Sequence, residues 1–151
     1  MSLKVAVIMG SSSDEDTMAP ARTTLEQFGV KCHWEVMSAH RTPEKVRQFV
    51  AGARDAGFGA IICGAGMAAH LAGATAAQTT LPVIGVPLAG GALNGVDSLY
   101  STVQMPKGIP VATVAINGAM NAALLAVQIL AVTDAGLADK LAAHRAEMAG
   151  G

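Results

Sequence analysis

The sequence predicts an α/β fold, a three-layer αβα sandwich around a doubly wound parallel sheet of five strands. Short apolar runs alternate with helical patterns along the whole chain, which is typical of parallel strands joined by right-handed crossovers. Two of these runs, VAVIM at 5–9 and PVIGV at 82–86, are apolar on both faces. A sheet that is covered by helices on both sides requires strands of this kind.

The first half of the chain is expected to form three strands and two helices. The strands are apolar runs at 4–9, 31–37 and 59–63. The helices between them are expected at 14–28 and 43–56. Pro43 suits the first position of a helix, and Gly29 and Gly57 suit the left-handed residue that closes one.

The second half continues the same alternation. The remaining elements are expected, in order, at 68–78 (an Ala-rich helix), 81–86 (strand), 96–104 (helix), 109–116 (strand), 119–132 and 134–149 (helices). The length of 151 residues suits one domain, 1–151, and no linker or repeat divides it. The predicted arrangement is of the flavodoxin-like kind.

The composition indicates a subunit of a homo-oligomer. Only 14% of the residues are charged, against roughly 25% in ordinary soluble domains, while 52% are hydrophobic. That leaves too little polar surface to cover a monomer. Burial in a membrane is the alternative, but it needs about 18 uninterrupted apolar residues, and Gly, Pro or polar residues break every apolar stretch.

The charged residues and the cysteines indicate which class of partner and which cellular compartment to expect. The ten Lys and Arg residues are scattered and the net charge is -1, so nucleic acid is not an expected partner, whereas a small molecule is. No secretory leader pattern precedes the first strand. Cys32 and Cys63 lie in apolar runs without CxxC spacing and are expected to be small buried residues, which fits a reducing cytoplasm.

The loop after the first strand, GSSSD at 10–14, is a candidate phosphate site. Ligands of doubly wound sheets bind at the carboxyl ends of the strands. Ser11 and Ser13 bring hydroxyl and backbone N–H groups to a helix N-terminus, where an anion is favoured, and Asp14 suits sugar hydroxyls. The structural alternative is a capping-box-like helix start by Ser13 and Asp16.

The segment SAHRTP at 38–43 places a histidine beside an arginine at the next strand end. The Arg41 guanidinium offers a bidentate fork for the same phosphate. His40 has no metal-ligand set around it in the sequence and suits general acid/base catalysis, with a structural histidine as the alternative. His70, in the loop after the third strand, is placed to face the same cleft.

Other ligand classes fit the motifs less well. GAGMAA at 64–69 matches GxGxxA, but the glycines follow the third strand and no acidic residue comes about 20 positions later, so a dinucleotide site is disfavoured. A signalling receiver domain would need an aspartate where Cys63 and Gly64 stand. The sequence has no GxSxG elbow for covalent catalysis. A proton-moving enzyme on a small phosphorylated sugar compound remains.

The motif series resembles the class I PurE family, the N5-carboxyaminoimidazole ribonucleotide mutases of purine biosynthesis. The resemblance runs from about residue 4 to residue 132 in seven ordered motifs, VIMGSSSD, SAHRTP, GAGMAAHLAG, LPVIGVP, ALNGVDSL, VQMPKGIPVATVAI and NAALLAVQIL. It implies a reaction without cofactor or metal, in which a carboxylate moves from an exocyclic nitrogen to ring carbon C4. It also implies a cytoplasmic homo-octamer, with the helix at 134–149 packing on neighbouring subunits.

The mechanism attributed to that family releases CO2 and recaptures it within the site. His40 is the implied catalytic group, giving a proton to the departing nitrogen and removing the C4 proton. The implied substrate-binding residues are Ser11, Ser13, Asp14, Ser38, Ala39, Arg41, Gly64, Ala65, Gly66, Ala69, His70 and Leu71. The ligand would be a phosphorylated aminoimidazole ribonucleotide.

Some positions depart from the usual family text, GAGGAAHLPG. Met67 replaces a glycine, Ala72 replaces a proline, and Gly90 and Gly91 stand where a polar or basic pair is usual. The animal-type branch, which carboxylates aminoimidazole ribonucleotide directly with CO2, typically has a GRSN-like third loop, so the mutase is favoured over the carboxylase. A non-catalytic nucleotide-binding module on the same fold is the more distant alternative.

Overall fold

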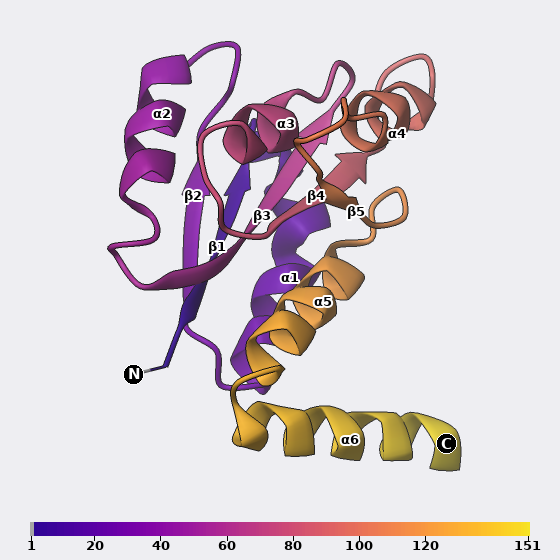
Figure 1. The fold of residues 1–151 in the computed structure, drawn as a ribbon. Coiled ribbons are helices and arrows are strands. Elements are labelled where there is room, and N and C mark those ends of the chain that lie inside the picture. The colour runs from indigo at the N-terminus through magenta and orange to yellow at the C-terminus, as the bar shows by residue number, and fades with distance from the viewer. Residues whose placement is uncertain (1) are drawn as a thin grey trace.

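The structure, a computed structural model, describes residues 2–151 and contains one parallel sheet with helices on both faces (Figure 1). The strands are β1 (Lys4–Met9), β2 (Cys32–Val36), β3 (Phe58–Gly66), β4 (Val83–Leu88) and β5 (Ala112–Thr113). Their order across the sheet is β2-β1-β3-β4-β5, and every paired strand is parallel to its neighbour. The predicted five-stranded, doubly wound fold is therefore confirmed.

The helices fall into two layers because the strand order reverses at β1. They are α1 (Glu15–Gln27), α2 (Pro43–Gly52), α3 (Leu71–Ala76), α4 (Val96–Val103), α5 (Ala119–Ala131) and α6 (Ala135–Gly150), with a short 3-10 turn η1 (Ser12–Asp14) before α1. Right-handed crossovers to β2 and to β3 run in opposite directions and so place α1 and α2 on opposite faces. The chain then returns to the first face, where α5 packs beside α1.

Each face of the sheet has its own apolar core. Val5, Val7 and Ile62 point toward α1 and α5, and Ala6 and Ile61 point toward α2 and α3. All five side chains are fully buried. Alternate residues of the same strand thus serve opposite layers, which explains why these runs are apolar throughout.

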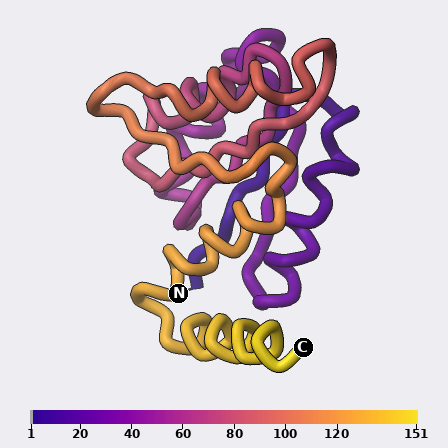
Figure 2. Tube along the Cα trace, turned by 90° about the vertical axis from the view of Figure 1, so that its right-hand side faces the viewer, coloured from indigo at the N-terminus to yellow at the C-terminus, as the bar shows by residue number. Residues whose placement is uncertain are grey.

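The last helix is the least buried of the α-helices. Among the residues of α6, only Leu137 is buried, and the helix lies at the amino-end edge of the sheet below α5, away from the carboxyl ends of the strands (Figures 1 and 2). Lys140 anchors it by donating a hydrogen bond to the Phe28 carbonyl at 3.0 Å. No helix in the described part of the chain is long and apolar enough to cross a membrane.

The fifth strand is much shorter than the predicted 109–116. Only Ala112 and Thr113 pair with β4, and Val114 adds one backbone bond to Gly85 at 3.1 Å. Two physical reasons account for this. The segment lies at a sheet edge, with one neighbour to pair with, and Pro110 has no N–H to donate to a ladder.

Two helix starts also differ from the prediction. The α1 helix follows η1 and begins at Glu15, and the side chain that caps this turn is Ser11, which accepts from the Ser13 backbone N–H at 3.2 Å. The capping-box interpretation of Ser13 was therefore wrong. The third helix begins at Leu71 rather than 68 because β3 continues to Gly66 and a turn follows.

Close packing at Gly85 gives a stability prediction. A Cβ there would clash with the Thr102 methyl group and lie 3.0 Å from Val111 Cγ1. We expect Gly85→Ala to lower the free energy of unfolding by about 1–3 kcal/mol through overpacking. Equilibrium urea unfolding at fixed protein concentration measures it.

Gly52→Ala is the matched control, because a Cβ added at this helical position would meet no atom of another element within 4 Å. That substitution should instead raise stability by about 0.5 kcal/mol. Equal unfolding midpoints for Gly85→Ala and the unaltered protein would contradict the packing argument.

Candidate active site

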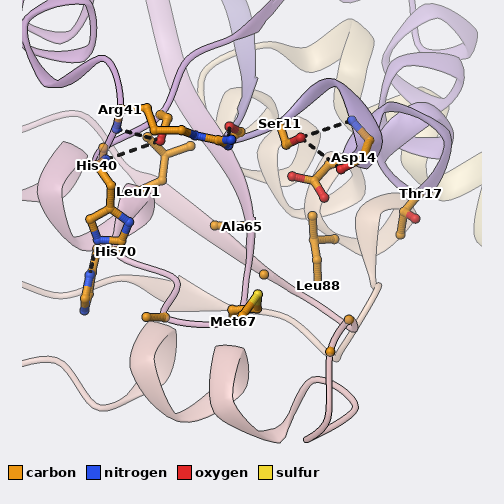
Figure 3. Close-up of a pocket in the computed structure, with 18 of the residues that line it drawn as sticks. Ser11, Asp14, Thr17, His40, Arg41, Ala65, Met67, His70, Leu71 and Leu88 are labelled. Carbon is orange, nitrogen blue, oxygen red and sulfur yellow. Dashed lines mark hydrogen bonds between the residues drawn. The ribbon is translucent and has the colours of Figure 1, made fainter.

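A pocket of about 430 Å³ opens at the carboxyl ends of the strands, beside the point where the strand order reverses (Figure 3). The loops after β1, β2, β3 and β4 line it. Of the site residues predicted from sequence, those that line this pocket are Ser11, Ser13, Asp14, Ser38, Ala39, His40, Arg41, Ala65, Gly66, His70 and Leu71. Four loops that are distant in sequence therefore share one cavity.

The loop after β1 forms the hydroxyl-rich side of the pocket. Ser11 and Ser13 are hydrogen bonded through their Oγ atoms at 2.9 Å, and the Asp14 backbone N–H donates to the Ser11 carbonyl at 3.1 Å. Burial raises the pKa of the Asp14 carboxyl, while the Ser11 backbone and the charge of Arg41 act in the opposite direction. These groups supply both donors and acceptors to a ligand.

A buried serine fixes the turn that carries His40 and Arg41. The Ser38 Oγ accepts from the His40 backbone N–H at 3.3 Å and from the Arg41 backbone N–H at 3.1 Å. The Ser38 N–H in turn donates to Thr42 Oγ1 at 2.8 Å. Ser38 is 8% exposed, so this turn is held from inside the fold while both side chains project outward.

Arg41 reaches across to the loop after β1. Its Nη2 donates to the Gly10 carbonyl at 2.7 Å, and this bond uses one of the five guanidinium N–H donors. The fork therefore lies beside the serine hydroxyls, as Figure 3 shows. An arginine and two hydroxyls at the start of a helix are suited to binding a phosphate.

Two histidines meet at the other side of the pocket. His40 Nε2 lies 2.6 Å from His70 Nδ1, and the rings are nearly perpendicular, at 86°. In this hydrogen bond one nitrogen must carry the hydrogen and the other must present a lone pair. Both residues are exposed at the pocket, where the pair is able to exchange a proton with a ligand.

Two residues of the predicted set do not line the pocket. Gly64 is buried behind it, where a Cβ would lie 2.6 Å from Met18 Sδ. Ala69 is 2% exposed, and its backbone N–H donates to Ser101 Oγ at 2.9 Å. Both residues support the pocket without lining it. Gly64 lets α1 pack closely on the sheet, and Ala69 ties the turn after β3 to α4.

Sequence reasoning selected no residue from the loop after β4, although that segment follows a strand end. The pocket residues outside the predicted set are Gly10, Thr17, Met67, Ala68, Leu88, Ala89, Gly90 and Gly91. Thr17 follows Asp14 by three residues, so helical spacing was the available signal for it. Gly10 belongs to the loop that the strand-end rule selects, and Met67, Gly90 and Gly91 are departures from the usual family text, so these two signals were available for them. Ala68, Leu88 and Ala89 carry no chemical signature, and only the folded structure reveals that they line the pocket.

Metal and thiol chemistry find no support at this site. No cluster of three or more His, Cys, Asp or Glu side chains suited to a metal ion occurs among residues 2–151. Burial raises the pKa of Cys32 to about 11 and that of Cys63 to about 12, so both thiols stay protonated near neutral pH. The arrangement supports acid/base chemistry by the histidine pair on an anchored anion.

The family model described as AIR carboxylase matches residues 4–150. The chain belongs to this family. A relative from Pyrococcus abyssi (strain GE5 / Orsay), named N5-carboxyaminoimidazole ribonucleotide mutase, is 53% identical over 96% of this chain and 83% of its own length. A relative of the same name from Escherichia coli (strain K12) is 56% identical over 91% of this chain and 83% of its own length.

A solved structure agrees with this chain in fold. The crystal structure of Treponema denticola PurE is 29% identical and aligns with a TM-score of 0.86, covering 97% of this chain and 91% of that one. The match confirms the flavodoxin-like three-layer architecture. The family model and the curated relatives confirm the resemblance to class I PurE that the motifs indicate.

Proposed function

We propose that this protein is an N5-carboxyaminoimidazole ribonucleotide mutase, which converts its substrate to 4-carboxyaminoimidazole ribonucleotide. The relatives from Pyrococcus abyssi and Escherichia coli, which are 53% and 56% identical to this chain, carry this name. The observation that carries the proposal is the composition of the pocket. The His40–His70 pair lies on one side of it, and the Arg41 guanidinium and the serine hydroxyls, which are suited to binding a phosphate, lie on the other. A phosphorylated ligand held at one end would present its ring to the histidines at the other.

The chemistry of each wall of the pocket supports one pose for the ligand. The phosphate would accept hydrogen bonds from the hydroxyls of Ser11 and Ser13 and from Arg41, while Asp14 would accept from the ribose hydroxyls. The heterocycle would lie over Ala65 and Gly66, where small residues let a ring approach the backbone. This pose brings the reacting atoms toward His40.

The reaction then needs one proton carrier. The bond between the exocyclic nitrogen and the carboxylate breaks, its electron pair returns to the nitrogen, and CO2 leaves. His40 gives a proton to that nitrogen, ring carbon C4 attacks the CO2 carbon, and His40 takes the C4 proton back. The contact between His40 and His70 supports this role, because a hydrogen bond of 2.6 Å to His70 Nδ1 fixes the orientation of the His40 ring toward the ligand.

Direct carboxylation of aminoimidazole ribonucleotide is the second candidate, which the description of the matching family favours. The two activities are separable with one enzyme preparation. We expect product from N5-carboxyaminoimidazole ribonucleotide without ATP, and much slower product formation from aminoimidazole ribonucleotide with bicarbonate. Ultraviolet absorbance of the product measures both rates, and the reverse preference would assign the protein to the carboxylases.

His40→Asn tests the proton carrier. An amide keeps a polar group of similar shape but cannot exchange a proton near neutral pH, so turnover should fall by at least about 100-fold. Ligand affinity should change little, because Arg41 and the serines are intact. Steady-state kinetics and calorimetric binding of the product give the two values, and an unchanged turnover would reject the assigned role.

We also infer that the protein works as a homo-oligomer, with the octamer as the expected size. Large apolar side chains stay exposed in the single chain, among them Leu93 (61%), Tyr100 (66%) and Val132 (83%). The nearly unburied α6 adds a second uncovered surface. Sedimentation velocity should give about eight times the chain mass of 15.2 kDa, and a monomeric species would contradict the inference.

The free thiols Cys32 and Cys63 suit the cytoplasm, the compartment we propose.

A further inference from the structure

Met67 occupies a backbone position that favours glycine. Its φ is +54°, in the left-handed region, where a Cβ is sterically disfavoured and glycine is not. Ser101 holds the turn from α4, because its Oγ accepts from the Ala69 N–H at 2.9 Å. The Met67 carbonyl lies 3.4 Å from the same Oγ, whose nearest acceptor is the Asp97 carbonyl at 2.8 Å. A large side chain retained on such a backbone points to a function for that side chain.

The Met67 side chain stands at the rim of the pocket, across from Arg41 (Figure 3). It is 62% exposed and is the large apolar group of the rim. A Cβ built on Gly91 would lie 3.8 Å from Met67 Cγ and 4.0 Å from its Sδ. The Met67 thioether therefore lies next to Gly91 in the loop that follows β4. Met67 and this loop together form one side of the pocket opening.

The proposed chemistry requires such a boundary. Once CO2 leaves the exocyclic nitrogen it is small, neutral and unable to form an ion pair, so the charged and hydroxyl groups of the pocket do not hold it. Its escape would turn recapture into a bimolecular step. An unbranched, flexible thioether is suited to closing an irregular gap over a bound ligand.

We propose that the Met67 side chain is the apolar barrier that retains CO2 between its release from nitrogen and its capture by C4. The inference rests on the proposed mutase function and assigns Met67 no part in proton transfer. It also explains the strained backbone, because glycine would relax the turn and leave the opening unfilled.

Label retention tests the barrier directly. N5-carboxyaminoimidazole ribonucleotide carrying ¹³C in its carboxylate is converted in the presence of excess unlabelled bicarbonate and carbonic anhydrase, and the ¹³C content of the product is measured by mass spectrometry. We expect the protein to retain most of the label. Met67→Gly should at least roughly double the fraction of label lost while C4 carboxylation continues, because CO2 then exchanges with solvent during turnover.

Three variants serve as controls. Met67→Leu keeps an apolar group of similar volume and should retain label as the unaltered protein does. Met67→Gln keeps the length but is polar, and it should lose label like the glycine variant. Asn94→Gly makes the same backbone change at another left-handed residue, with φ +52°, which does not line the pocket, and it should retain label.

The thermal midpoint separates the barrier from a structural role. Met67→Gly should unfold at a temperature equal to or higher than the unaltered protein, because the strain at φ +54° is relieved. Label retention by Met67→Gly equal to that of the unaltered protein would overturn the barrier, and so would complete loss of turnover in a folded, ligand-binding Met67→Gly variant. Absence of product from the unaltered protein would instead reject the mutase function itself.

Discussion

The reversal of strand order at β1, in a sheet whose strands are all parallel, is the constraint on which this structure depends. Because the crossovers from β1 and from β2 run opposite ways, α1 and α2 cover opposite faces, and the loops that enter them separate at the carboxyl ends. The opening between those loops is the pocket. It needs no specialised element, since it follows from right-handed crossovers and the strand order.

Charged groups are few in this chain, and four titratable side chains meet at that opening. Only 14% of the residues are charged, yet Asp14, His40, Arg41 and His70 all line one cavity. The backbone of His40 and Arg41 is supported by neutral contacts, namely hydrogen bonds from both N–H groups to the buried hydroxyl of Ser38. A neutral buried anchor keeps its place without the desolvation cost that a buried charge would carry.

One of the non-glycine residues with left-handed backbone lines the pocket. The three non-glycine residues with positive φ among residues 2–151 are Met67, Asn94 and Asn117. Asn117 braces the loop after β4, because its N–H donates to the Pro87 carbonyl at 2.8 Å and its Oδ1 accepts from the Ala89 N–H at 2.9 Å. Asparagine tolerates the left-handed region through local hydrogen bonds, whereas methionine gains nothing comparable there. This contrast is what makes Met67 informative.

The sequence by itself determined the fold class, the position of most helices and strands, and the loops that carry Ser11, Asp14, His40 and Arg41, because hydrophobic periodicity and the strand-end rule act locally. It did not determine the length of the fifth strand, since pairing at a sheet edge depends on the neighbour. Nor did it place His70 against His40 or Met67 against Gly91, because these contacts join loops from different strands. Only the tertiary structure sets the distance between groups that crossovers bring together from far along the chain.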